Sequence, residues 1–301
     1  MKIWCGVLSF PLFIFSLVLH ASFNAVADAP FTLTDDRGRS VRMNHFARRI
    51  ISLSPNITEL VFAAGAGDKL VGVSSYSDYP DVAKSIPGIG DSSSLDLERI
   101  VALKPDLVIA WNSGNKVADI DKLERLGLTV FITEATKLED IPRLLRKIGK
   151  LAGTLAIAEL AASAFEAELR KIKQRYRSRQ QVEVLYLIWH RPLMTVSDNH
   201  IISDIINICG GINVFAAAPS LTLVISAESI LGADPQIIIS SMPLVSPETG
   251  RRELWQRFPH IRAVRNNHLF FVHPDLIHRQ TPRMLQAAKT VCEQLESARS
   301  G

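Results

Sequence analysis

The stretch Glu98-Arg-Ile-Val-Ala-Leu-Lys-Pro-Asp-Leu-Val-Ile109 returns 130 residues later as Glu228-Ser-Ile-Leu-Gly-Ala-Asp-Pro-Gln-Ile-Ile-Ile239. Both copies begin Glu-x-Ile, place a proline seven residues after the glutamate, and continue into a short apolar run. Each copy therefore predicts a short helix that stops before the proline, followed by a buried strand. A repeat at this distance indicates two similar α/β lobes and a cleft between them, where small ligands usually bind. Because the match is short, a chance likeness between two helix-Pro-strand units is the alternative.

The segments around the repeat alternate between apolar runs and helical patterns, which is typical of a parallel α/β sheet. After a hairpin at 31–43, we expect strands at 49–54, 70–73, 107–110, 129–132, 182–188, 237–240 and 269–272. No glycine or proline occurs between Gly153 and Pro192, and residues 154–177 have helical periodicity. We therefore expect a first lobe over 28–150, a linking helix over 151–180 and a second lobe over 181–301.

The first 27 residues are typical of a cleavable secretory signal peptide. Lys2 precedes an apolar run, and the small-residue site Ala25-Val-Ala27 follows it. An uncleaved membrane anchor is the alternative, but Pro11 and the Ala-x-Ala site favour cleavage. No later segment reaches the roughly 18 continuous apolar residues that a spanning helix needs. We expect a soluble mature protein outside the cytoplasm.

Charge and cysteine content narrow the function classes. Removing Lys2 lowers the formal net charge from +4 to +3, and the basic cluster from Arg170 to Arg179 fits a solvated helix face better than a nucleic-acid surface. Loss of Cys5 leaves Cys209 and Cys292, which in an oxidising compartment most simply form one disulfide. Without a Cys-x-x-Cys motif or a nearby histidine at ligand spacing, a metal site at either cysteine is not expected.

Motifs for catalysis do not emerge from the sequence. It contains no Gly-x-Ser-x-Gly elbow, no phosphate-binding P-loop and no His-Glu-x-x-His. We therefore expect no enzyme activity and no resident cofactor. His190, His273 and His278 do not pair at metal-ligand spacing, although one imidazole could ligate the metal of a bound ligand.

Four segments, in order along the chain, resemble the periplasmic cobalamin-binding proteins of vitamin B12 ABC importers (the BtuF-like group). They are Arg49–Leu60, Val71–Pro80, Leu97–Trp111 and Cys209–Phe215. The resemblance implies a class III periplasmic binding protein, in which two Rossmann-like lobes are joined by a single long rigid helix. It also implies a periplasmic monomer that captures a corrinoid, cobalamin first, and delivers it to an ABC importer permease. Haem or a ferric siderophore is the alternative ligand, and a secreted tetrapyrrole-acting enzyme is the alternative of another class.

The resemblance assigns expected roles to individual residues. Ligand contacts are implied at Tyr76, Trp111 and the late loop Asp275, Leu276, Ile277, His278 and Arg279. Docking onto the permease is implied at Glu98 and Glu228, whose alternative role is to stabilise their own helix N-termini. A disulfide between Cys209 and Cys292 is implied as well.

Two aromatic positions of the family are absent from this chain. Ser92-Ser93-Ser94 stands where family members carry a tryptophan, and Leu276-Ile277 stands where they carry Trp-Phe. Trp189 and His190, which follow a predicted strand of the second lobe, are candidates for a replacement wall, because a flat aromatic face suits a macrocycle.

Overall fold

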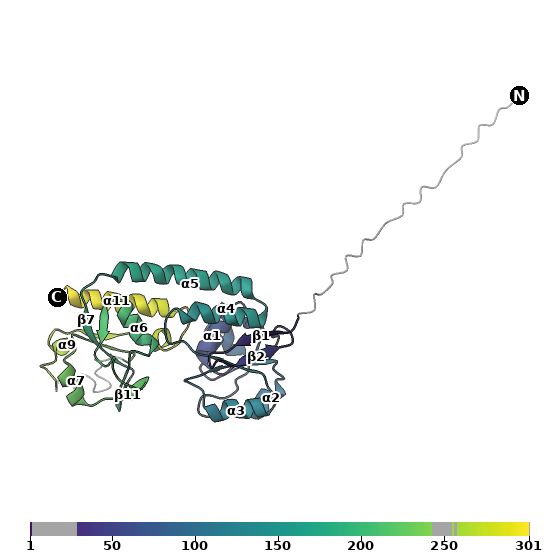
Figure 1. Cartoon of the computed structure of the whole chain (residues 1–301), viewed down its shortest axis with the longest axis horizontal. Coiled ribbons are helices and arrows are strands. Elements are labelled where there is room, and N and C mark those ends of the chain that lie inside the picture. Colours follow the sequence, from purple (N-terminus) through teal and green to yellow (C-terminus); the bar gives the residue numbers. More distant parts are fainter. Residues whose placement is uncertain (2–28, 243–254, 256–257, 301) are drawn as a thin grey trace.

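The computed structural model describes Met1, residues 29–242, Trp255 and residues 258–300. Except for Met1, the expected signal peptide lies outside the described residues. The described chain forms two α/β lobes lying side by side (Figure 1). This confirms the predicted fold class.

The first lobe is built on a parallel sheet in the order β4-β3-β5-β6. Its strands are β3 (Ile50–Ser52), β4 (Leu70–Val73), β5 (Leu107–Trp111) and β6 (Val130–Thr133). Its helices are α1 (Pro55–Ala63), α2 (Leu97–Ala102), α3 (Val117–Arg125) and α4 (Asp140–Ala152), with 3₁₀ turns η1 (Gly67–Lys69) and η2 (Asp81–Ser85). The predicted hairpin is present as β1 (Phe31–Thr34) and β2 (Ser40–Met43). The parallel strands are almost wholly buried, as expected when both faces of a sheet are covered.

The second lobe repeats this topology in the order β10-β7-β12-β13, so in each sheet the first strand lies between the second and the third. Its strands are β7 (Val182–Leu187), β10 (Gly211–Asn213), β12 (Ile237–Ser240) and β13 (Leu269–Phe271). Its helices are α6 (Ile201–Ile208), α7 (Ala227–Ala233), α9 (Arg262–Arg265), α10 (Pro274–Ile277) and α11 (Met284–Arg299). The repeat becomes α2–β5 in one lobe and α7–β12 in the other, so the predicted duplication of a helix-Pro-strand unit is confirmed.

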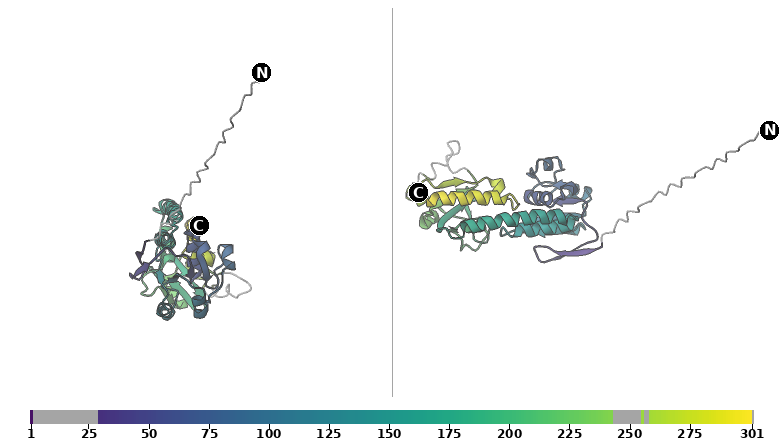
Figure 2. Two further views of the ribbon diagram at one scale, coloured as in Figure 1. Left: turned by 90° about the vertical axis from the view of Figure 1, so that its right-hand side faces the viewer. Right: turned by 90° about the horizontal axis from the view of Figure 1, so that it is seen from above.

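A single long helix, α5 (Leu155–Tyr176), connects the lobes. Its 22 residues span about 33 Å at 1.5 Å per residue. It packs on α4 of the first lobe and on α11 and α6 of the second, and Figure 2 shows α11 alongside it from above. The helix is shorter than the predicted segment 151–180, because Gly153 ends α4 in a left-handed conformation that glycine adopts readily.

The sequence analysis missed two elements. Residues 189–192 were expected to form a loop, but β8 (Trp189–His190) and β9 (Leu193–Val196) form a hairpin that continues to β11 (Thr222–Val224). The strand β8 has only two residues, which is too short for an alternating apolar pattern to be recognised in the sequence. The late loop likewise contains the short helix α10.

The predicted disulfide is confirmed. Cys209 follows α6, Cys292 lies within α11, and the two sulfur atoms are bonded at 1.99 Å. Both residues are fully buried. The bond therefore ties the last helix of the chain to the second-lobe core.

Candidate ligand-binding cleft

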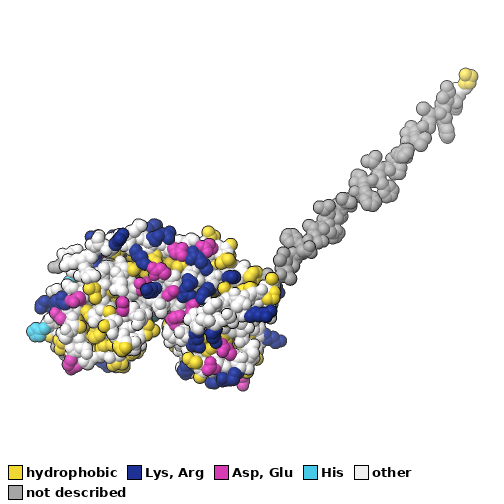
Figure 3. Space-filling view, in the orientation of Figure 1, with side chains coloured by type: hydrophobic (Ala, Val, Ile, Leu, Met, Phe, Trp, Pro, Cys, Tyr) yellow, Lys and Arg dark blue, Asp and Glu magenta, His cyan; other side chains and the backbone are white. Residues whose placement is uncertain are grey.

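Three pockets that share lining residues extend across the two lobes as a cleft. A pocket of about 240 Å³ lies in the first lobe, one of about 400 Å³ lies between the lobes, and one of about 700 Å³ lies in the second lobe. Trp111 lines the first two and Ile188 lines the last two. In Figure 3 the surface is notched between the lobes on the side away from α5.

The cleft lies at the carboxyl ends of the parallel strands, where open α/β sheets usually bind ligands. Trp111, the last residue of β5, lines it. The other strands β4, β6, β7, β12 and β13 are followed by the lining residues Tyr76, Glu134, Ile188, Ser241 and Pro274 respectively. Loops at strand ends are free to carry recognition residues because the sheet below supports them. The loops at the strand ends of both sheets therefore line the cleft.

The first-lobe pocket presents two aromatic residues and a polar wall. Tyr76 has 78% of its surface exposed and a positive φ of 66°. Trp111 is half-buried, and its Nε1 donates to Glu134 Oε1 at 3.2 Å. Ser92 and Ser93 complete the wall where family members carry a tryptophan. A ligand here would meet the two aromatic rings beside hydroxyl groups.

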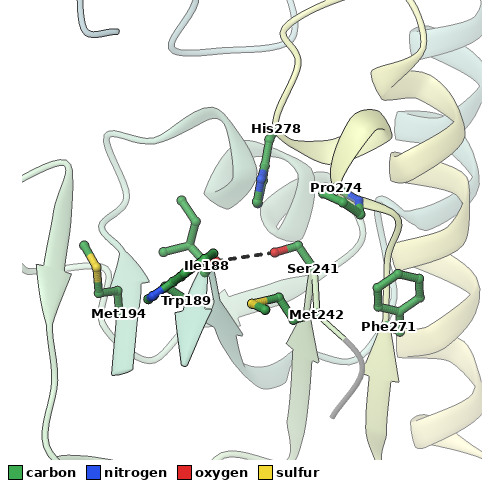
Figure 4. A pocket seen from close by; sticks show the side chains of 8 residues that line it. All are labelled: Ile188, Trp189, Met194, Ser241, Met242, Phe271, Pro274 and His278. Atoms are coloured by element: carbon green, nitrogen blue, oxygen red, sulfur yellow. Dashed lines mark hydrogen bonds between the residues drawn. The ribbon is translucent and has the colours of Figure 1, made fainter. Parts of the chain in front are cut away.

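The second-lobe pocket is mostly apolar (Figure 4). Its lining is Ile188, Trp189, Met194, Ser241, Met242, Phe271, Pro274 and His278. Trp189 is 49% exposed, and its indole Nε1 donates to the Arg191 carbonyl at 2.8 Å, which holds the ring in place. This wall of aromatic, aliphatic and thioether groups can cover a large flat ligand.

His278 contributes an imidazole to this apolar pocket. Its Nε2 lies 2.9 Å from the Tyr186 hydroxyl, and Tyr186 is fully buried. Burial lowers the pKa of His278 to about 4. The ring is therefore neutral at the pH of most cellular compartments.

The remaining residues that were expected to contact the ligand differ in how far they are buried. Asp275 and Leu276 are half-buried, and His190 Nδ1 lies 3.1 Å from the Met242 sulfur. Ile277 is fully buried in the hydrophobic core. The short helix α10 turns the Ile277 side chain inward, so the ligand contact expected there stays a prediction that this buried position does not support.

Arg279 lies in an ion cluster between the lobes. Its Nη1 is 3.0 Å from Glu59 and 2.6 Å from Asp78, both of the first lobe, and its Nη2 is 3.1 Å from Asp275. Nη2 also donates to the Tyr76 carbonyl at 3.3 Å. The guanidinium holds the pKa of Asp78 below its ordinary value. Arg279 thus positions the Tyr76 loop in this structure.

A second arginine completes this inter-lobe cluster. Arg283 contacts Glu59 at 2.5 Å, and its guanidinium lies 4.0 Å from the centre of the Tyr79 ring. Asn56 Nδ2 also donates to Gln280 Oε1 at 2.9 Å. Since the Glu59 side chain is only 3% exposed, its charge depends on these two arginines for compensation.

Glu98 and Glu228 are exposed and do not line the three cleft pockets. They lie near the start of α2 and α7. Figure 1 places both helices on the side of the molecule opposite α5. In each lobe, therefore, one acid is presented on the side where the cleft opens.

Sequence analysis missed Ser241, Met242 and Phe271, and also His200 in the pocket between the lobes. The first three lie at the carboxyl ends of β12 and β13, and both strands were predicted. Their position at these strand ends could have identified them as cleft residues. His200 gave no signal, because it belongs to the loop before α6. In the part of the chain that the structure describes, no group of three or more His, Cys, Asp or Glu could hold a metal ion.

The profile of the periplasmic binding protein family matches residues 50–276, which include the strands of both four-stranded parallel sheets. The chain belongs to this family. Its predicted class, a solute-binding protein, is thereby confirmed. Among the described residues, no helix is both long enough and apolar enough to cross a membrane.

Named relatives match this family member over most of its length. A vitamin B12-binding protein of Vibrio parahaemolyticus is 35% identical over 85% of this chain and 92% of its own. One from Yersinia pestis is 34% identical over 83% and 87%. These likenesses confirm the resemblance seen in the sequence.

Solved structures agree. The periplasmic vitamin B12-binding protein BtuF of Vibrio cholerae has a TM-score of 0.79 and 33% identity, covering 85% of this chain and 99% of its own. The periplasmic haem-binding protein RhuT of Roseiflexus has a TM-score of 0.74 and 25% identity, covering 84% and 99%. The fold is thus shared by proteins whose names carry different tetrapyrrole ligands.

Proposed function

We propose that this protein captures a corrinoid, cobalamin, in the cleft between its lobes and delivers it to an ABC importer permease. The observation that carries the proposal is the likeness to vitamin B12-binding proteins over about 85% of the chain. The cleft chemistry supports it, because Trp189, Phe271 and Met194 supply apolar surface for a macrocycle. Polar groups around Trp111 and Ser93 can meet amide side chains.

Haem is the second candidate ligand. His278 favours it, because a neutral imidazole in an apolar pocket is a good ligand for iron. The likeness to a haem-binding protein, at 25% identity, is weaker than the likeness to the vitamin B12-binding protein. Cobalamin therefore remains the first proposal.

The location and the delivery step are part of the same proposal. Residues 1–27 act as a signal peptide that sends the chain to the periplasm, where it works as a monomer. Glu98 and Glu228 then meet basic pockets on the permease, since complementary charges orient an encounter. The two lobes that enclose the ligand are residues 28–152, up to the end of α4, and residues from 181 onward, with α5 between them.

Titration calorimetry of the mature protein tests the ligand. We expect one cyanocobalamin per chain, and no comparable heat from haemin or from a ferric hydroxamate. Trp189→Ala should weaken cobalamin binding by about tenfold, because an aromatic face is lost from the cleft.

Leu160→Ala is the matched control, since Leu160 is exposed on α5, away from the cleft, and its loss should leave affinity unchanged. Binding of haemin or the siderophore alone would reject the corrinoid assignment. Turnover of the bound tetrapyrrole would reject the binding-protein role itself.

A further inference from the structure

The helices that carry the docking acids are equivalent in detail. In α2 the Asp96 carboxylate accepts from the Arg99 backbone N–H at 2.9 Å. In α7 the Ser226 hydroxyl accepts from the Ser229 backbone N–H at 3.2 Å. In both lobes a polar N-cap residue lies two residues before the glutamate. Each glutamate is therefore the second residue of its helix.

The equivalence continues to the end of each unit. Ile100 and Ile230, two residues after the glutamates, are buried. Lys104 and Asp234, which precede the prolines, both adopt positive φ angles, of 46° and 38°. Both units therefore leave the helix through the same uncommon backbone conformation. The two lobes therefore present the same surface unit twice.

One exposed apolar residue accompanies each acid. Val101 and Leu231 lie three residues after Glu98 and Glu228, and each has 43% of its surface exposed. Residues three apart share one face of a helix, so acid and apolar residue lie side by side. Neither Val101 nor Leu231 lines a cleft pocket.

A single exposed aliphatic residue is ordinary on a protein surface. Here the same exposure recurs at equivalent positions of two lobes that differ in most of their residues. In Figure 1, α2 and α7 lie on the same side of the molecule, opposite α5, and Figure 3 shows hydrophobic side chains reaching the surface there. A partner with two equivalent sites fits a surface unit that occurs twice.

We propose that Val101 and Leu231 are the apolar half of a two-point docking surface, and that each packs on an apolar rim beside the basic pocket that receives Glu98 or Glu228. The occupant is the paired permease of the importer. This inference rests on the proposed function and adds two residues to it. The acids orient the encounter through long-range electrostatic attraction, which salt screens. The apolar side chains stabilise the docked complex by burying surface, and this contribution does not depend on salt.

The experiment measures docking of the mature protein to its own importer permease in nanodiscs, by fluorescence polarisation, without ligand and with excess cyanocobalamin. Val101→Thr and Leu231→Asn keep side-chain size and remove apolar character. Each should weaken docking about fivefold, and the pair about twentyfold or more, at both 50 mM and 500 mM salt. Glu98→Gln with Glu228→Gln should weaken docking most at low salt.

Leu160→Asn, on the opposite side of the molecule, is the matched control and should dock normally. A thermal melt and a cobalamin titration of each variant should match the wild type, because no core or cleft contact changes. Normal docking of the apolar variants beside weakened acid variants would overturn this inference alone. Normal docking of both sets would overturn the docking role in the proposed function together with it.

Discussion

At the scale of single residues, the cleft holds two imidazoles in their neutral form. His278 lines the second-lobe pocket and His200 lines the pocket between the lobes. Burial lowers the pKa of each to about 4, and for His200 the nearby His278 adds to the effect. In an unfolded chain a histidine titrates near 6.5, so the unfolded state binds these protons first.

The free energy of unfolding should therefore be highest above pH 6.5 and fall as the pH drops towards 4. Each imidazole contributes about 3 kcal/mol of this loss, because protonation favours the unfolded chain throughout that window. Urea unfolding at pH 7.5, 6 and 4.5 measures it. His200→Asn and His278→Asn should each flatten the dependence, and the double variant should flatten it most. An unchanged slope in the double variant would show that other groups govern it.

Single residues also show how far a sequence resemblance carries. Tyr76, Trp111 and His278, where the resemblance implies ligand contacts, line the cleft. Trp189, proposed from its place after a predicted strand, lines it as well. Ile277 belongs to the same sequence motif but is fully buried. A motif specifies the order of residues, whereas the turn of α10 decides which of them face a ligand.

At the scale of elements, the disulfide joins the end of α6 to α11, two helices that are far apart in the sequence. The separation between Cys209 and Cys292 is 83 residues. In the chain-entropy model, closing a loop of this length stabilises the native state by about 4.5 kcal/mol.

Cys209→Ala with Cys292→Ala should lower the free energy of unfolding by about that amount, with some of the loss coming from the vacated core volume. Urea unfolding of the variant and of the wild type, with and without reductant, measures the effect. Reductant should shift only the wild type. Two free thiols in the denatured, non-reduced wild type would contradict the bond.

Elements with a strong local signal were predicted, and those without one were missed. Both copies of the helix-Pro-strand unit were predicted, because a proline ends the helix and an apolar run follows. The strand at Ile237–Ser240 agrees with its prediction to the residue. The hairpin β8–β9 was missed because its pairing comes from neighbouring strands rather than from its own pattern.

At the scale of the whole molecule, the lobes are joined by a helix and by an ion cluster between them. The helix is α5, and the cluster is the one around Glu59. The Leu138 backbone N–H also donates to Asp204 of α6 at 2.8 Å. Glu59 belongs to α1 of the first lobe, whereas Arg279 and Arg283 precede α11 of the second. Opening the cleft on that side would separate a buried carboxylate from both arginines.

Glu59→Gln should therefore destabilise the protein by about 3 kcal/mol, because Arg283 loses the partner that compensates its charge. Cobalamin should also dissociate faster. Arg279, which donates to the Tyr76 carbonyl, loses its ion pair with Glu59 and holds the Tyr76 loop less firmly. Urea unfolding and stopped-flow release measure the two effects. Glu168→Gln is the control, because its pairs with Lys171 and Lys289 lie on the surface and should add nothing measurable. Equal behaviour of the two variants would mean that the cluster does not hold the lobes.

By itself the sequence determined the two-lobe α/β fold, the pairing of Cys209 with Cys292 and the two acid-bearing helices. These follow from local periodicity, prolines at fixed offsets and the count of cysteines. Only the tertiary structure decided that Arg279 joins the lobes, that Ile277 faces the core and that Val101 and Leu231 stand beside the acids equally exposed. These features depend on contacts between segments that are far apart in the sequence. Local sequence patterns do not specify such contacts.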